Sequence, residues 1–143
     1  MPRAPLLPLL ASVALSGAAC RSATQITIEV TTDLPCKDLG STSITVGTID
    51  ALETKFPTSV TSHCEAGRVG ALVVVPSGDD GAELALRVVT GLRGKDPDAC
   101  VREGYAGDCI VARRAIHFTP HTSRTVDVVM RNVCAGVACV APG

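Results

Sequence analysis

The side chains whose types and spacing could bind a metal are two histidines late in the sequence. His117 and His121 are four residues apart, a spacing that suits a metal site on a helix. Pro120 lies between them, and the pattern on both sides indicates a hairpin, where this spacing does not place two side chains on one face. No third ligand is evident in the sequence. We therefore predict two solvent-exposed turn histidines and no metal site.

Three acidic residues form a second candidate. Asp79, Asp80 and Glu83 resemble a fragment of a calcium loop, but the alternating oxygen ligands of a complete loop are missing. The run from Pro76 to Gly81 is also the strongest turn signal in the chain. A solvated turn is the favoured interpretation.

A catalytic site cannot be assembled from the sequence. His63, beside Cys64, is the best available general base, but no nucleophile and orienting group can be combined with it. The chain has no G-x-S-x-G turn and no phosphate-cradling glycine loop. We predict that the protein is not an enzyme and uses no cofactor. A secreted enzyme with a non-standard site is the alternative.

Seven cysteines carry the clearest chemical signal, because an odd number in a secreted protein leaves one thiol for another use. The stretch Leu15–Cys20 (LSGAAC) resembles a bacterial lipobox, although Gly17 stands where the leucine of a lipobox is usual. If Cys20 is acylated, the six remaining cysteines can pair completely. The alternative is ordinary cleavage after Ala19, which would release a soluble protein.

The residues before Cys20 predict export. Arg3 gives a positive start, and Leu6–Ala19 is an apolar run that ends in small residues. This run is shorter than the roughly 20 residues of a membrane-spanning helix. We expect a location in the cell envelope, at the outer membrane or in the periplasm, with secretion as the alternative. The predicted divisions are a cleaved signal peptide over residues 1–19, a lipidated N-terminus and tether over 20–24, a β-sandwich domain over 25–132 and a cysteine-containing tail over 133–143.

The six later cysteines predict a disulfide framework. Six cysteines allow fifteen connectivities. Short separations favour the local bridges Cys100–Cys109 and Cys134–Cys139, which leaves Cys36–Cys64 by elimination. The last spacing is not C-x-x-C, so a structural bridge is favoured over a redox role. In an oxidising compartment each bridge adds ~2–4 kcal/mol to the stability.

Composition limits both the partners and the core. The chain has 13 Lys plus Arg and 14 Asp plus Glu, and it contains no polybasic run. A nucleic-acid partner requires a clustered positive face, so this class of partner is excluded. The aromatic residues are only Phe56, Tyr105 and Phe118. The core must therefore be built from Val, Ile, Leu and Ala, which makes disulfide support more important.

Period-two alternation of apolar and polar residues places the strands. In Gln25–Thr32, for example, Ile26, Ile28 and Val30 share one face. Short strands separated by turns predict an all-β fold, a small antiparallel β-sandwich of about seven strands, immunoglobulin-like or prealbumin-like and disulfide-stapled. The predicted strands are Gln25–Thr32, Thr42–Ile49, Phe56–Cys64, Val69–Val75, Ala82–Thr90, Ile110–Phe118 and Arg124–Arg131.

Five segments need a further decision. Asp50–Lys55 has capping-box spacing but is stopped by a proline, so it is left open between a helical turn and a loop. Phe56–Cys64 reads as a weak edge strand, and Val69–Val75 is apolar on both faces, which predicts an interior strand. Ala82–Thr90 is favoured as a strand over a helix because it ends in β-branched residues. Gly91–Asp108 reads as a charged surface loop.

The runs IVARRAIHFTPHTSRTVDVVM and VVVPSGDDGAELALRVV resemble the strand-turn-strand pattern of transthyretin-like modules. Over most of the mature chain, including the tail CAGVAC, the sequence is similar to uncharacterised cysteine-containing lipoproteins of myxobacteria. That resemblance implies an exported lipoprotein, and it brings no established activity or functional residues.

Strand direction predicts where the cysteines lie. If each strand runs opposite to the one before it, all six later cysteines reach the end of the domain away from Gln25. We expect a non-catalytic binding or structural module, held on a membrane by its N-terminal lipid, with a protein or glycan partner at this cysteine-rich pole and no nucleic acid. The alternative is an accessory subunit of a larger envelope complex, which a crosslinked partner would reveal.

Overall fold

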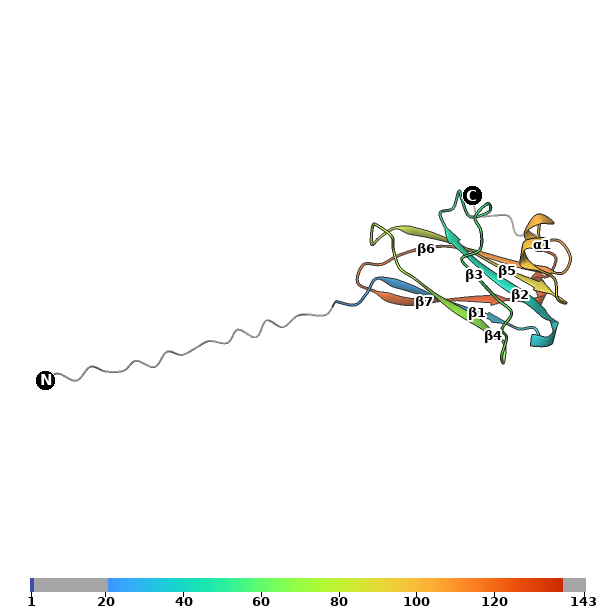
Figure 1. Ribbon diagram of the computed structural model, residues 1–143, viewed down its shortest axis with the longest axis horizontal. Coiled ribbons are helices and arrows are strands. Elements are labelled where there is room, and N and C mark those ends of the chain that lie inside the picture. Colours follow the sequence, from blue (N-terminus) through green and yellow to red (C-terminus); the bar gives the residue numbers. More distant parts are fainter. Residues whose placement is uncertain (2–20, 138–143) are drawn as a thin grey trace.

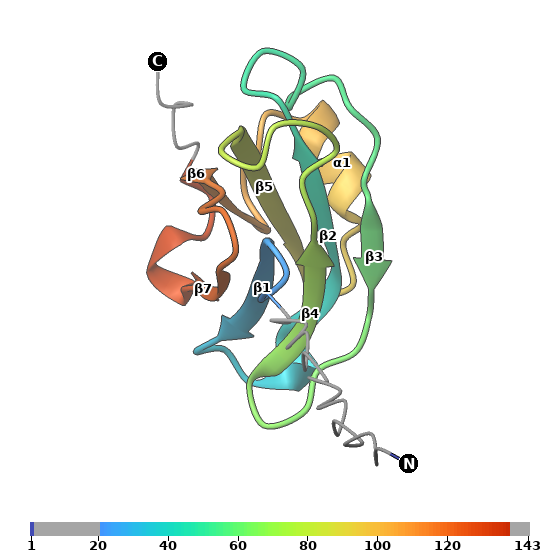
Figure 2. The same cartoon turned by 90° about the vertical axis from the view of Figure 1, so that its left-hand side faces the viewer.

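Alternating strands build two facing sheets. The structure is a computed structural model that describes Met1 and residues 21–137. Sheet one has the strand order β4-β1-β7, and sheet two has the order β3-β2-β5-β6 (Figures 1 and 2). The strands are β1 (Gln25–Thr32), β2 (Leu39–Gly47), β3 (Ser59–Thr61), β4 (Arg68–Val74), β5 (Glu83–Leu92), β6 (Cys109–His117) and β7 (Ser123–Met130), and the short helices are η1 (Cys36–Asp38), α1 (Pro97–Arg102) and η2 (Asn132–Cys134). The predicted disulfide-stapled β-sandwich is confirmed.

The core lies between the sheets and is aliphatic, as the scarcity of aromatic residues predicts. In β1, Ile26, Ile28 and Val30 are fully buried, which confirms the alternation on which this strand was predicted. They pack against inward side chains of the other sheet, including Leu86 and Val88 of β5. Burial of such aliphatic side chains, each contributing ~1.5–3 kcal/mol, stabilises the sandwich.

One strand pair departs from the antiparallel prediction. β1 and β7 are parallel and in register from the pair Gln25 and Ser123 to the pair Thr32 and Met130. All other pairs are antiparallel. The physical reason is the alternation itself: the first and seventh strands of an alternating series run the same way. When the sandwich brings them together, they can pair only in parallel.

The position of β4 corrects a second prediction. Its apolar residues on both faces indicated an interior strand, but among the described strands β4 is the edge of its sheet and pairs with β1 alone. Val73 and the following Val75 are 56% and 61% exposed. The interior strands of the other sheet are β2 and β5, and β5 is buried from Leu84 to Leu92. The predicted edge strand Phe56–Cys64 is reduced to the three residues of β3.

The segment predicted as a charged loop contains a helix. α1 begins after Asp96, whose side chain accepts a hydrogen bond from the Asp98 N–H at 2.7 Å, and it has Pro97 in its first turn. The turn before α1 sits tightly on the sheet, because a Cβ on Gly91 would overlap the Lys95 carbonyl group. Local capping signals and this close approach place α1 beside β5 and β2 (Figure 2).

Candidate functional site

Two disulfides are formed at one end of the sandwich. Cys36 and Cys64 are bridged with 5.4 Å between their Cα atoms, and Cys100 and Cys109 with 5.7 Å. Both predicted pairings are therefore confirmed. Cys134 forms no disulfide with another cysteine among the described residues. Its predicted partner Cys139 lies outside the described residues, as does the predicted lipid-attachment residue Cys20, so the Cys134–Cys139 bridge and the lipidation stay predictions.

Backbone pairing brings these cysteines together. The ends of β1 and β7 meet at Thr32 and Met130, directly before the segments that hold Cys36 and Cys134. On the other sheet, Gly91 is paired with Cys109. The Gly136 N–H donates to the Cys109 carbonyl at 2.9 Å, which ties the end of the described chain to the same place. We call this end, with Cys36, Cys64, Cys100, Cys109 and Cys134, the disulfide pole (right-hand end of Figure 1).

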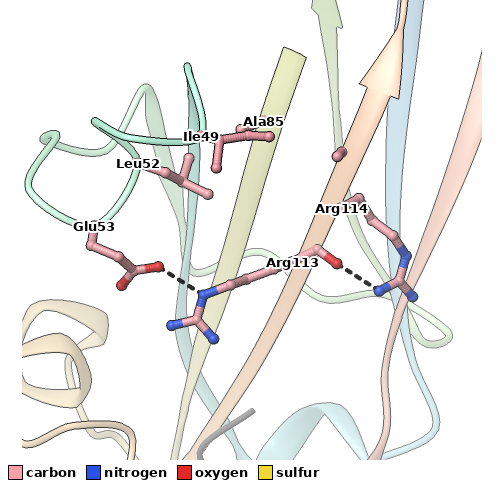
Figure 3. Close-up of a pocket in the computed structure, with 7 residues that line it drawn as sticks. Ile49, Leu52, Glu53, Ala85, Arg113 and Arg114 are labelled. Atoms are coloured by element: carbon pink, nitrogen blue, oxygen red, sulfur yellow. Dashed lines mark hydrogen bonds and ion pairs between the residues drawn. The ribbon is translucent and has the colours of Figure 1, made fainter. Parts of the chain in front are cut away.

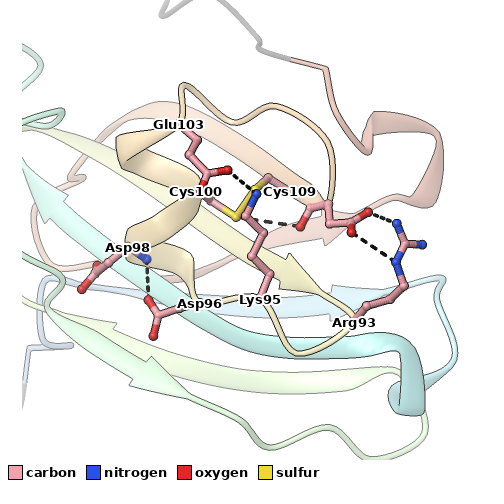
Figure 4. The surroundings of a disulfide bond; sticks show 8 residues. Arg93, Lys95, Asp96, Asp98, Cys100, Glu103 and Cys109 are labelled. Carbon is pink, nitrogen blue, oxygen red and sulfur yellow. Dashed lines mark hydrogen bonds and ion pairs between the residues drawn. A yellow bond between two sulfur atoms is a disulfide. The ribbon is translucent and has the colours of Figure 1, made fainter.

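Charged side chains surround the buried disulfide of this pole. Lys95 Nζ lies 2.5 Å from Glu103 Oε2 across α1, and Arg93 pairs with Asp108 (Figure 4). Both pairs are partly exposed to solvent, so each contributes little to stability. A cleft of about 270 Å³ opens beside them, lined by Leu34, Pro35, Asp38, Leu92, Arg93 and Asn132. The pole therefore offers a rigid, polar and hollowed surface.

A second site, which the sequence did not reveal, lies on the outer face of the sheet β3-β2-β5-β6. Arg87 of β5 is only 2% exposed, and its Nη1 lies 3.2 Å from Glu53 Oε2. Arg113 of β6 donates from Nε to Glu53 Oε1 at 2.7 Å. The Tyr105 hydroxyl donates to Glu53 Oε2 at 2.6 Å, and its ring lies under the Arg113 guanidinium. We call these four residues the Glu53 cluster.

The electrostatics of this cluster favour an ionised Glu53. The hydrogen bond from Arg113 lowers the pKa of Glu53 to about 2; burial opposes this shift, and the Tyr105 hydrogen bond and the charges of both arginines assist it. Burial and the hydrogen bond to Glu53 raise the pKa of Tyr105. One carboxylate therefore joins the loop before β3 to two strands and to the segment after α1.

One cavity beside the Glu53 cluster, of about 200 Å³, is lined by Glu53, Arg87 and residues of α1, and another is too small for an organic substrate. The smaller cavity has a volume of about 30 Å³ and is lined mainly by apolar groups of Ile49, Leu52 and Ala85 with the stem of Arg113 (Figure 3). That is the volume of about one water molecule. The contacts of Glu53 with Arg87 of β5 and Arg113 of β6 make the cluster a clamp that holds a loop on the sheet.

The residues singled out from the sequence are placed apart from this cluster. His117 ends β6 and lies 3.2 Å from Glu83 Oε2, whereas His121 lies in the turn before β7. Asp79 caps its turn by accepting the Gly81 N–H at 3.0 Å. Among the described residues, no group of three possible ligands is gathered for a metal ion. His63 lies in the exposed segment between β3 and β4.

The ionisation of Glu53 predicts a pH-dependent stability. Its pKa is about 2 in the folded protein against 4.5 for the free group, so its contribution is complete above about pH 5 and is lost as the pH falls toward 2. Its side chain is 42% exposed, so we expect solvent screening to limit the loss to ~1–2 kcal/mol. Urea unfolding at pH 7, 4 and 2.5 measures it. In Glu53→Gln this part of the decline should disappear, and an unchanged decline would contradict the assignment.

No protein-family model matches this sequence, and a search of curated proteins finds no relative. The function is therefore inferred from the residues and their positions.

Proposed function

We propose that this chain is an exported, lipid-anchored protein of the cell envelope that serves as a non-catalytic binding or structural module. The leader over residues 1–19 and the lipobox-like stretch ending at Cys20 support export and acylation. Two disulfides in a small domain with an aliphatic core suit an oxidising compartment. Among the described residues, no helix is long and apolar enough to cross a membrane.

The position of the disulfide pole relative to the first strand carries the proposal. β1 begins at Gln25, five residues after Cys20, and such a tether spans at most roughly 18 Å. The eight residues of β1 then extend about 26 Å to the disulfide pole. A lipid on Cys20 would hold the start of β1 near the membrane, and the disulfide pole would face away from it. We propose this pole as the contact surface for a protein or glycan partner.

The anchor is tested by replacing Cys20. In Cys20→Ser we expect either a soluble protein in place of one that partitions into detergent, or an uncleaved precursor, because the acceptor thiol is gone. Cell fractionation and intact-protein mass spectrometry measure both results. Cys134→Ser is the matched control, since it makes the same replacement at the other end of the domain. Unchanged mass and partitioning in Cys20→Ser would leave a plain signal peptide and a secreted protein.

A further inference from the structure

A cleft of about 440 Å³ opens at the end of the sandwich opposite the disulfide pole. Val74 of β4 and Leu84 of β5 both line it, so it lies where the two sheets part. Val74 pairs with Ile26, which places the cleft beside the start of β1. Its walls come from the segments that follow β2 and β4, and the second of these turns back at the left-hand end of the domain in Figure 1. We call it the sandwich cleft; its volume is within the roughly 300–1,000 Å³ that is usual for small-molecule sites.

The lining of the sandwich cleft is mainly apolar. Its least exposed residues are the core side chains Val46, Leu84 and Phe118, which are 8%, 7% and 6% exposed. Val75, in the wall, is 61% exposed. Removal of apolar surface from water is favourable, so a hydrocarbon chain that covers these side chains would be bound. The cleft therefore suits an apolar chain better than a polar molecule, whose hydrogen-bonding groups would lose their contact with water.

Two charged residues line the sandwich cleft, and they differ in their partners. Glu83 lies 3.2 Å from His117, and alternation along β5 turns it to the outer face, away from the buried Leu84. Lys55 forms no ion pair among the described residues. Its side chain crosses Gly47, where a Cβ would come within 3.1 Å of Lys55 Cδ and 3.5 Å of its Nζ. The rim of the cleft therefore carries one ammonium group that no described carboxylate neutralises.

This combination of lining and charge selects among the occupants. A cationic amphiphile would be repelled by Lys55, and a neutral hydrocarbon would leave its charge unused. Residues 138–143 start from the disulfide pole, where Gly136 is bonded to Cys109, and they span at most roughly 20 Å, less than the length of β5. The chain's own C-terminus therefore does not reach the cleft. A single-chain amphiphile with one carboxylate would cover the apolar lining and accept a charge-assisted hydrogen bond from Lys55 Nζ.

We propose that the sandwich cleft binds a free fatty acid, with its carboxylate at Lys55 and its hydrocarbon chain over Val74, Leu84 and Phe118. This site goes beyond the proposed function, which places a partner at the opposite pole and assigns no ligand to this end. In the orientation proposed above, this end lies near the membrane, where such amphiphiles partition. Binding does not require the lipid anchor. A protein released by Cys20→Ser should bind as well as the anchored form, so the two proposals fail separately.

The first experiment titrates dodecanoate, kept below its micelle concentration, into the unmodified chain and into Cys20→Ser. Calorimetry should show saturable binding of one molecule to each protein. NMR should show shifts of the methyl signals of Val46, Val74 and Leu84. Dodecyltrimethylammonium is the matched probe, because it has the same chain and the opposite charge, and we expect it to bind about tenfold more weakly. Equal binding of the two probes, or no saturable binding of dodecanoate, would overturn the proposal.

Two variants test the charge and the space of the cleft separately. Lys55→Glu reverses the charge at the rim, and Lys37→Glu at the disulfide pole is its matched control. Ala51→Trp fills the cleft from an exposed position and removes no core side chain, and Ala106→Trp, also exposed, is its control. We expect about tenfold weaker binding of dodecanoate to Lys55→Glu and Ala51→Trp. Binding should be unchanged in both controls and in Lys55→Arg, which keeps the charge.

Other occupants give different results, and each would overturn the proposal. If dodecanoate binds Cys20→Ser but not an acylated unmodified chain, the cleft holds the protein's own lipid rather than a free fatty acid. If the same methyl signals shift when the protein alone is concentrated, with a doubled mass in analytical ultracentrifugation, a second copy covers the cleft. Unchanged binding of dodecanoate to both Lys55→Glu and Ala51→Trp would place its site elsewhere on the molecule.

Discussion

Replacement of Glu53 by alanine is expected to lower the free energy of unfolding by about 3 kcal/mol. Glu53 is the only carboxylate in contact with Arg87 and Arg113 among the described ion pairs, and their side chains are 2% and 8% exposed. Its removal leaves the buried Arg87 guanidinium without this counter-charge. Arg87 would keep only the Tyr105 and Thr45 hydroxyls and backbone carbonyls as acceptors. Urea unfolding at pH 7 measures the loss.

Two comparisons test whether the loss of stability in Glu53→Ala comes from leaving a buried charge unpaired or would follow the removal of any acidic residue. Glu29 pairs with Arg68 at 3.2 Å on the surface, where the side chains are 35% and 65% exposed, so Glu29→Ala should cost less than ~1 kcal/mol. Adding Arg87→Met to Glu53→Leu should recover ~1–2 kcal/mol, because an apolar side chain then replaces the unpaired charge. If Glu53→Ala costs no more than Glu29→Ala, the Glu53 cluster is not a clamp.

Strand positions could be predicted because a strand with one buried face has apolar residues at every second position. This alternation is clear in β1, where Ile26, Ile28 and Val30 are all fully buried. Where both faces of a strand are apolar, there is no alternation to show which face is buried. Val69–Val75 looked interior for this reason, whereas the structure puts most of it on β4 at a sheet edge with Val73 exposed. Sheet order depends on contacts between distant segments, which no local pattern contains.

The Glu53 cluster could not be found in the same way. Arg87 stands in the strand ELALRVVTGL, where alternation assigns it to the outer face and so to solvent. It is buried because α1 and the loop holding Glu53 cover that face. Two faint signals existed: an arginine inside an apolar strand, and the capping-box spacing of Asp50 and Glu53. Neither signal indicates that Glu53 contacts Arg87, because only the tertiary fold brings these two residues together.

Loss of the Cys36–Cys64 disulfide is expected to lower the free energy of unfolding by about 3.5 kcal/mol. The bridge closes a loop of 28 residues, and restriction of the unfolded chain grows with loop length. For the nine-residue loop of Cys100–Cys109 the same relation gives about 2.5 kcal/mol. Urea unfolding of Cys36→Ala/Cys64→Ala under non-reducing conditions measures the effect. It is a large part of the stability of a domain of this size.

Burial predicts that the less exposed of the two disulfides is the more resistant to reduction. Cys36 and Cys64 are half-buried, whereas Cys100 and Cys109 are fully buried with Val89 and Tyr105. A mild thiol reductant should therefore open Cys36–Cys64 in the folded protein, and Cys100–Cys109 should open only on global unfolding. Alkylation followed by peptide mapping distinguishes the two. Simultaneous opening of both disulfides would contradict the predicted order of reduction. If Cys36→Ala/Cys64→Ala were as stable as the unmodified protein, the Cys36–Cys64 bridge would not constrain the unfolded chain.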